Sequence, residues 1–229
     1  MKKALKYTAA VAIAALLLYS GIYFEDLSQV RQLRQQKTFD PSSYARDFWD
    51  NQLAGILDKA VDVEELIELF NTNMAEAVKR YGKAPGVSRV YAYLVTGEGQ
   101  IVAVGEDGLL VSVRDPADNP DAFVTTGLYV PGNAVRDASG LVDVSKFSDT
   151  MKFNEISREI NKIVVEEVIR PFMNRGPKVG VTVKFYGATQ VAQDATEEHF
   201  FGELLSNDGT EKEFQLVTIV PIRLELKEP

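Results

Sequence analysis

The chain offers few side chains for catalysis, because its 229 residues include one histidine and no cysteine. His199 is the only candidate for an imidazole base, and no Gly-x-Ser-x-Gly nucleophile motif accompanies it. Its neighbours, Thr-Glu-Glu-His-Phe-Phe, indicate a surface turn with an aromatic pair directed inward. An enzyme would gain support only if Arg136, Asp137 and His199 met in one cleft. We therefore expect a protein that is not an enzyme.

No cofactor and no metal site are expected either. The glycine motifs that bind nucleotide phosphates are absent from any strand–turn–helix context, since Gly97 and Gly99 belong to a predicted hairpin turn. The acidic stretch over 115–121 lacks the spacing and the central glycine of an EF-hand, so a solvated loop is expected there rather than a calcium site. A zinc site would have to combine one histidine with carboxylates, which is an uncommon ligand set.

The most distinctive polar segment runs from Val130 to Gly140 and contains a Pro-Gly turn after a predicted strand. Within it, Asn133, Arg136 and Asp137 could form a ligand-facing cluster, in which the guanidinium binds a carboxylate or a pair of hydroxyls. The alternative is a structural brace, in which Arg136 pairs with Asp137 or with backbone groups and fixes the loop. The sequence leaves both alternatives open.

The single tryptophan, Trp49, is a further candidate for ligand binding, because an indole ring can stack on a sugar ring. Tyr44 and Phe48 share its predicted helix, so a place in the hydrophobic core is the alternative.

Pairs of carboxylates do not indicate a glycosidase here. With 33 acidic residues, some pair meets the spacing of a glycosidase by chance.

Two helices are predicted to come before the strands. Asp40 and Pro41 form a helix start, and apolar residues follow at near-helical spacing up to Leu57. A second helix begins at Asp62, whose carboxylate can cap it, and ends before Gly82. We expect the two helices to pair antiparallel across their short connection.

From residue 86 onward, apolar residues alternate with polar ones, which predicts strands over 89–95, 101–104, 109–113, 123–130, 179–186 and 214–226. A long amphipathic helix lies between the fourth strand and the last pair, with Ser148 or Asp149 as its cap. Pro221 indicates an edge position or a bulge in the last strand. This order favours a small closed or nearly closed β-barrel with a helical unit, and the oligonucleotide/oligosaccharide-binding (OB) barrel is one member of that class.

The N-terminus predicts a membrane anchor. Three lysines precede an uncharged run of 18 residues, whose helical length of ~27 Å is close to the thickness of a bilayer core. Bulky residues stand where a signal peptidase would require small ones, which favours an uncleaved signal anchor over a cleaved signal peptide. The lysines place the body outside the cytoplasm, on the periplasmic or cell-surface side. We divide the chain into an anchor (1–24), a stalk (25–38), a helical subdomain (39–85) and a β-barrel subdomain (86–229).

The overall composition excludes several classes of protein. Hydrophobic residues make up 45% and charged residues 25% of the chain, which is typical of a globular domain rather than a polytopic membrane protein. The net charge of -8 repels phosphate backbones, so nucleic acid is not expected as a partner. The expected contact with the membrane is therefore made through the N-terminal helix, not through the acidic body.

Several motifs together resemble one bacterial family. They are Phe-Asp-Pro-Ser-Ser-Tyr-Ala-Arg-Asp-Phe-Trp-Asp, Lys-Arg-Tyr-Gly, Pro-Gly-Asn-Ala-Val-Arg-Asp-Ala-Ser-Gly, Phe-Asn-Glu-Ile-Ser-Arg-Glu-Ile-Asn, Val-Lys-Phe-Tyr-Gly-Ala and Ile-Val-Pro-Ile-Arg-Leu-Glu, in this order between Phe39 and Glu225. The order and spacing resemble the predicted periplasmic lipoproteins of unknown function. The resemblance implies an α+β fold, with a small helical subdomain and a β-barrel of the OB type that carries an inserted long helix. It also implies frequent encoding beside sugar ABC transporters, and it supplies no catalytic residues.

The sequence departs from this family in its means of attachment. A lipoprotein carries its lipid on a cysteine at the end of the apolar run, and here Ile22 follows Leu17-Leu18-Tyr19-Ser20-Gly21. With no cysteine, lipid attachment of that kind is not possible. The uncleaved N-terminal helix would provide the anchor instead.

We expect a single-pass, membrane-anchored accessory or binding protein outside the cytoplasm, linked to the uptake of sugars or other solutes by an ABC transporter. Its partner would be a small polar solute or a component of the transporter. The alternative is a structural protein–protein interaction module of the cell envelope that binds no small molecule. A concave pocket lined by Tyr, Asn and Arg would favour the first function, and a flat exposed apolar patch the second.

Overall fold

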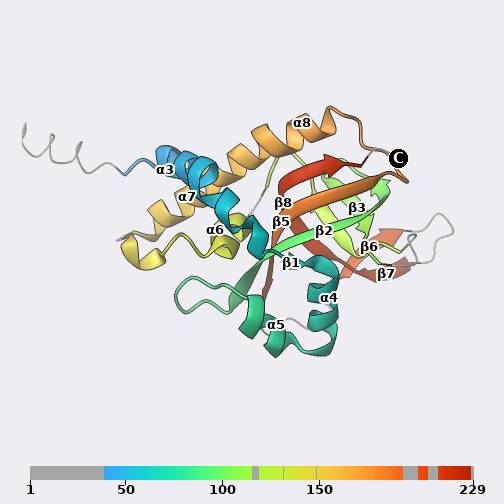
Figure 1. Ribbon diagram of the computed structural model, residues 1–229, viewed down its shortest axis with the longest axis horizontal. Helices are drawn as coiled ribbons and strands as arrows, with labels where there is room; N and C mark the ends of the chain where they lie inside the picture. Colours follow the sequence, from blue (N-terminus) through green and yellow to red (C-terminus); the bar gives the residue numbers. More distant parts are fainter. Residues whose placement is uncertain are drawn as a thin grey trace, which may run out of the picture. The chain divides into compact units, whose positions relative to one another are not determined.

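The computed structural model describes residues 39–114, 119–130, 132–147, 149–192, 201–205 and 211–227 (Figure 1). The residues from Asp40 onward form one compact unit. Its helical segments are α3 (Pro41–Asp47), η1 (Phe48–Gln52), η2 (Leu53–Lys59), α4 (Val63–Thr72), α5 (Met74–Tyr81), α6 (Ala134–Ser139), η3 (Val144–Lys146), α7 (Thr150–Ile163), η4 (Val164–Ile169) and α8 (Arg170–Met173). Its strands are β1 (Val61–Asp62), β2 (Val90–Val104), β3 (Gly108–Ser112), β4 (Ala122–Thr125), β5 (Thr182–Ala192), β6 (Phe201–Leu205), β7 (Glu211–Gln215) and β8 (Val217–Leu226).

The predicted anchor over 1–24 and the predicted stalk over 25–38 lie outside the described residues. Among the helices that are described, none combines the length and the apolar character needed to cross a bilayer.

Short polar side chains start three of the helices, as the sequence predicts. Asp40 accepts a hydrogen bond from the backbone N–H of Ser42 at 3.0 Å, with Pro41 in the first turn of α3. Asp62 caps α4 in the same way, through the N–H of Glu64 at 2.8 Å. The cap of α7 is Asp149, which accepts from Met151 at 2.8 Å. These bonds satisfy amides that have no partner within the helix.

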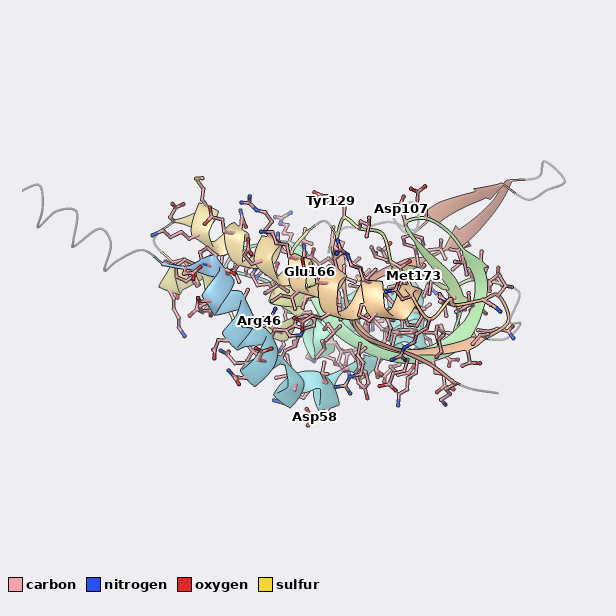
Figure 2. All side chains as sticks on the ribbon, turned by 90° about the horizontal axis from the view of Figure 1, so that it is seen from above. Arg46, Asp58, Asp107, Tyr129, Glu166 and Met173 are labelled. Atoms are coloured by element: carbon pink, nitrogen blue, oxygen red, sulfur yellow. The ribbon has the colours of Figure 1, made fainter. Side chains whose placement is uncertain are left out.

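The predicted pairing of the first two helices is wrong. Helix α3 packs along α7 instead (Figure 2). Arg46 of α3 donates a hydrogen bond to Glu167 of η4. The predicted second helix is also divided, because Asn73 leaves the helical conformation and its side chain caps α5 through the N–H of Glu76 at 3.1 Å. An asparagine that competes for backbone amides ends one helix and starts the next.

Strand β2 runs through the predicted hairpin turn at Gly97 and Gly99, so that turn is wrong. Its first part pairs antiparallel with β5, and its last part pairs with β3. The two glycines permit close approach by neighbouring groups rather than chain reversal. A Cβ at Gly97 would lie 2.6 Å from Cγ1 of Val63, and one at Gly99 would collide with the carbonyl oxygen of Ser112.

The strands of the main sheet are ordered β2, β3, β4, β8, β5, and β5 pairs again with β2, so the hydrogen-bonded neighbours form a closed cycle. The contact of β4 with β8 is parallel, and the other contacts in the cycle are antiparallel. Pro221 of β8 lies next to a shift in register against Tyr186 and Gly187 of β5, which confirms the predicted irregularity. The segment from 193 to 210, for which no pattern was predicted, contributes β6 to a separate hairpin with β7.

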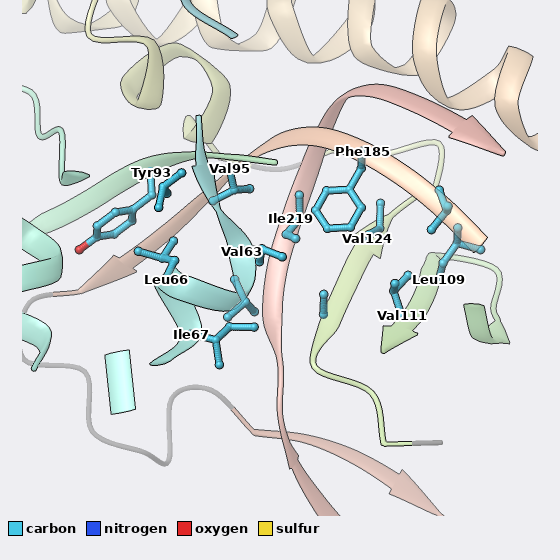
Figure 3. Close-up of a cluster of buried hydrophobic side chains, with 14 of the residues drawn as sticks. Val63, Leu66, Ile67, Tyr93, Val95, Leu109, Val111, Val124, Phe185 and Ile219 are labelled. Atoms are coloured by element: carbon cyan, nitrogen blue, oxygen red, sulfur yellow. The ribbon is translucent and has the colours of Figure 1, made fainter. Parts of the chain in front are cut away.

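Side chains from the strands and from α4 form one hydrophobic core (Figure 3). Tyr93, Phe185 and Ile219 are fully buried there, together with Leu66 and Ile67 of α4. Figure 1 shows α7 and α8 on one side of the strands and α4 and α5 on the other. Helix α4 therefore shares one core with the strands. The boundary predicted between a helical subdomain (39–85) and a β-barrel subdomain (86–229) stays a prediction.

We expect Gly97→Ala to lower the free energy of unfolding by about 1–3 kcal/mol, because the added methyl group has no space in this core. It would lie 2.6 Å from Val63 Cγ1 and 2.7 Å from Phe185 Cζ, and both side chains are buried. Urea unfolding measures the change. The matched control is Gly55→Ala, where nothing lies within 4 Å of the new methyl group. Equal stability of the two variants would contradict the close packing around Gly97.

Candidate functional site

Arg136 lies inside α6 and is buried, with 2% of its surface exposed. Its Nε donates to Oδ1 of Asp137 at 2.7 Å, and its Nη1 donates to the carbonyl of Phe153 at 2.8 Å. The guanidinium also lies over the Phe153 ring, 3.5 Å from the ring centre. These contacts hold α6 against the first turn of α7.

Asp137 lies beside Arg136 in α6, and Asn133 precedes this helix. Oδ2 of Asp137 accepts from Nε2 of Gln190 on β5 at 3.2 Å, so the buried carboxylate has partners on both oxygens. Asn133 is half-buried at the start of α6, and its side chain makes no capping bond. The geometry is that of the predicted brace. A role of Asn133, Arg136 and Asp137 in ligand binding stays a prediction.

The pKa of Asp137 is raised above 3.8, because burial penalises its charged form by more than Arg136 and Gln190 favour it. A raised pKa in the folded state means that Asp137 contributes stability which is complete below pH 3.8 and is lost as the pH rises through the folded pKa. We expect a carboxyl carbon NMR titration of Asp137 to give a midpoint above 3.8. A midpoint at or below that value would show that the bonds from Arg136 outweigh burial.

Trp49 lines a cleft of about 310 Å³ that contains none of the residues of this brace. Its side chain is partly buried and packs against the hydrophobic core, as the core alternative predicted. The same residue also lines the cleft. The remaining lining comes from η4, α8, the turn after α8 and β8: Glu167, Val168, Pro171, Phe172, Arg175, Ile222, Arg223 and Leu224.

Two π-helical segments contribute to the lining of the Trp49 cleft. Trp49 belongs to η1, and Glu167 and Val168 belong to η4. A π-helical turn changes the direction of the side chains relative to an α-helix, is rare, and occurs frequently at functional sites. Arg46, at the end of α3 and one turn before Trp49, donates to Oε1 of Glu167 at 2.6 Å and so joins α3 to η4.

The charges that face the Trp49 cleft are mainly positive. The lining carries two arginines, Arg175 and Arg223, against one carboxylate, Glu167, which is paired with Arg46. Within the described ranges, neither of these arginines forms an ion pair. Two free guanidiniums beside an indole can bind a carboxylate through paired hydrogen bonds while a ring stacks on the tryptophan.

Local structure fixes both arginines. Arg175 lies in the turn after α8, where its backbone N–H bonds to the carbonyl of Phe172 at 3.0 Å. Arg223 lies on β8 opposite Tyr186, with its guanidinium 5.8 Å from the centre of that ring. The sequence prediction named Trp49 but missed both arginines. Their only signals were an exposed position in an alternating strand and a basic turn, which are common features of protein surfaces.

The structure does not bring the predicted site residues together. Trp49 and the Arg136–Asp137 pair line different regions, and His199 lies outside the described residues. The acidic stretch over 115–121 is described only in part. In that part, Asp121 is buried, and its carboxylate accepts bonds from the guanidinium and from the backbone N–H of Arg114.

Comparison with known proteins gives two matches. A family model described as "Predicted periplasmic lipoprotein (DUF2291)" matches residues 12–200. The crystal structure of an OB-fold protein from Thermotoga maritima is similar, with a TM-score of 0.67 and 29% sequence identity over 83% of this chain and 100% of that chain. No curated protein matches the sequence. The structural similarity supports the expected α+β class with an OB-like fold.

Proposed function

Because the chain belongs to the family of predicted periplasmic lipoproteins, we propose that it acts outside the cytoplasm as a binding protein whose Trp49 cleft holds a sugar acid. The observation that carries this proposal is the meeting of two π-helical segments at one cleft that contains the single tryptophan and two arginines with no ion pair among the described residues. Rare backbone geometry, an aromatic ring and anion-binding groups coincide at this place.

The size and polarity of the Trp49 cleft restrict the ligand. A volume of about 310 Å³ is near the lower end for binding pockets, which suits one small ligand rather than a polymer. The floor is apolar, with Val168, Phe172 and Leu224, and the rim carries Arg175 and Arg223. A sugar acid matches both parts, since its ring has an apolar face and its carboxylate accepts bonds from arginine.

The role we propose is binding rather than catalysis. The cleft offers a carboxylate, Glu167, that is already bonded to Arg46, and two arginines whose side chains donate hydrogen bonds and accept none. Neither arrangement supplies a nucleophile with an adjacent base. We propose further that an N-terminal helix attaches the protein to the membrane and that the bound solute is passed to an ABC transporter.

Titration calorimetry of the full chain tests this function. D-galacturonate should bind saturably, and D-galactose, which differs in having a hydroxymethyl group in place of the carboxylate, should bind at least about tenfold more weakly. Trp49→Ala should remove binding. Tyr129→Ala, which removes an exposed aromatic ring outside the cleft, is the matched control. Equal affinity for the two sugars, or binding that survives in Trp49→Ala, would refute the proposal.

A second candidate function is an interaction module of the envelope. The observation that favours it is the pair Leu128 and Tyr129, which are 75% and 81% exposed on the loop between β4 and α6. Asn161 of α7 fixes this loop by donating to the carbonyls of Val130 and Gly132 at 2.9 and 3.0 Å. A photo-crosslinker at Tyr129 should capture one envelope protein in cells. Capture of no discrete partner would remove this candidate.

A further inference from the structure

A second cavity of about 430 Å³ lies where η2, α5, β2 and the end of α6 meet. Its surface is apolar over a large part, with Ile56, Leu94 and Leu141, and the backbone of Gly140 forms another part of the wall. None of its lining residues belongs to the Trp49 cleft. The cavity is therefore a separate place in the fold.

Three cationic side chains line this cavity in a chain whose net charge is -8. Arg80 is paired with Glu65 at 3.2 Å, and the same carboxylate accepts a bond from the hydroxyl of Tyr81 at 2.6 Å. Lys59 and Lys83 have no ion pair in the part of the chain that the structure describes. Two exposed lysines without an ion pair among the described residues thus line the cavity beside apolar side chains.

The backbone fixes Lys83 at this position. Its N–H and its carbonyl both bond to Ala92 of β2, at 2.9 and 2.7 Å. Its aliphatic stem passes over Gly140, where an added Cβ would lie 3.6 Å from Cδ of Lys83. Gly140 has a positive φ of 65° as the cap of α6, so glycine both ends the helix and leaves room for the stem. Lys59 enters from the last turn of η2.

We propose that this second cavity binds a small organic anion with an apolar body, such as an aromatic or short aliphatic carboxylate. The carboxylate bonds to Lys59 and Lys83, and the apolar body lies against Ile56, Leu94 and Leu141. The ligand needs both the carboxylate and the apolar body. A lysine ammonium alone binds an anion weakly in water, and an apolar body packed against the wall excludes water from the contact between the carboxylate and the lysines. This ligand differs from the sugar acid of the Trp49 cleft, and the proposal does not depend on it.

The test is a titration of the full chain with benzoate, followed by calorimetry and by amide chemical shifts. Benzamide supplies the same body without the charge, and sulfate supplies charge without the body. Benzoate should bind saturably and shift the amides of Leu94 and Gly140, and Lys59→Gln/Lys83→Gln should weaken it about tenfold or more. The matched control is Lys146→Gln/Lys178→Gln, which removes two exposed lysines outside the cavity.

Each result of this titration decides the proposal. Trp49→Ala should leave benzoate binding unchanged, which separates this cavity from the Trp49 cleft. Benzamide bound as tightly as benzoate would overturn the role of the lysines, and sulfate bound as tightly would overturn the role of the apolar wall. Unchanged binding in Lys59→Gln/Lys83→Gln, or no binding at all to the wild type, would refute the site.

Discussion

Replacing Arg136 with alanine is expected to lower the free energy of unfolding by about 3–5 kcal/mol, because the buried carboxylate of Asp137 loses its charge partner. Arg136 also bonds to the carbonyl of Phe153 and covers its ring, so the variant loses this bond and leaves a void in addition. For a chain of this size, the loss corresponds to a fall in Tm of about 6–20 °C. Thermal and urea unfolding measure both quantities.

Two controls separate the charge from the general cost of substitution. Arg89→Ala removes an exposed arginine and should change the free energy of unfolding by less than about 0.5 kcal/mol. Replacement of both partners, Arg136→Met with Asp137→Leu, should recover most of the loss, since no buried charge is left alone. If Arg136→Ala instead kept its Tm and lost affinity for a ligand, the segment would be the ligand-facing cluster and not a brace.

Replacing both arginines of the Trp49 cleft, as Arg175→Gln/Arg223→Gln, is expected to weaken binding of D-galacturonate by about 100-fold or more. Each guanidinium contributes a charge-assisted hydrogen bond worth about 1.5–3 kcal/mol, and about 1.4 kcal/mol is a factor of ten in affinity. Both residues are exposed and lack ion pairs within the described residues, so the fold should be retained. Calorimetry measures the affinity, and the unchanged Tm shows that the fold is intact.

The matched variant for this comparison is Arg89→Gln/Arg158→Gln, which removes two exposed arginines that do not line the Trp49 cleft. It lowers the net charge by the same amount and should bind galacturonate as the wild type does. If both double variants lost affinity equally, the effect would come from the overall charge, and the assignment to Arg175 and Arg223 would fail.

Local signals in the sequence predicted much of the fold. Asp40, Asp62 and Asp149 cap helices where their spacing indicated, because capping depends on a few neighbouring residues. The irregularity at Pro221 followed from its missing N–H. The resemblance to the predicted periplasmic lipoproteins is confirmed, and with it the OB-like α+β class.

The wrong predictions concern partners that are distant in the sequence. Gly97 and Gly99 indicate a turn when only their neighbours are considered, yet β5 and α4 pack on β2 at this point and require glycine within a continuous strand. Likewise, the first helix has an apolar face that suits any partner, and its partner α7 lies more than 100 residues further along the chain. The periodicity of a helix shows which face is buried but not what covers it.

The candidate site also combines a residue that the sequence identifies with residues that only the fold brings to it. Trp49 could be named from the sequence because tryptophan is rare and chemically distinctive. Arg175 and Arg223 reach it from a turn and a strand far along the chain, so only the fold reveals that they share its cleft. For Arg136 and Asp137, the sequence allowed a ligand site or a brace, and their burial and mutual hydrogen bond, with a further bond from Gln190 to Asp137, favour the brace.

The most direct test of the proposed function uses the fluorescence of Trp49, because the chain contains no other tryptophan. Every change in indole emission therefore reports on the Trp49 cleft. Titration of the full chain with D-galacturonate should give a saturable change in intensity or wavelength, and D-galactose at the same concentrations should give little. An emission spectrum that stays constant with galacturonate and other sugar acids up to millimolar concentrations would contradict the assignment of this cleft as a sugar acid site.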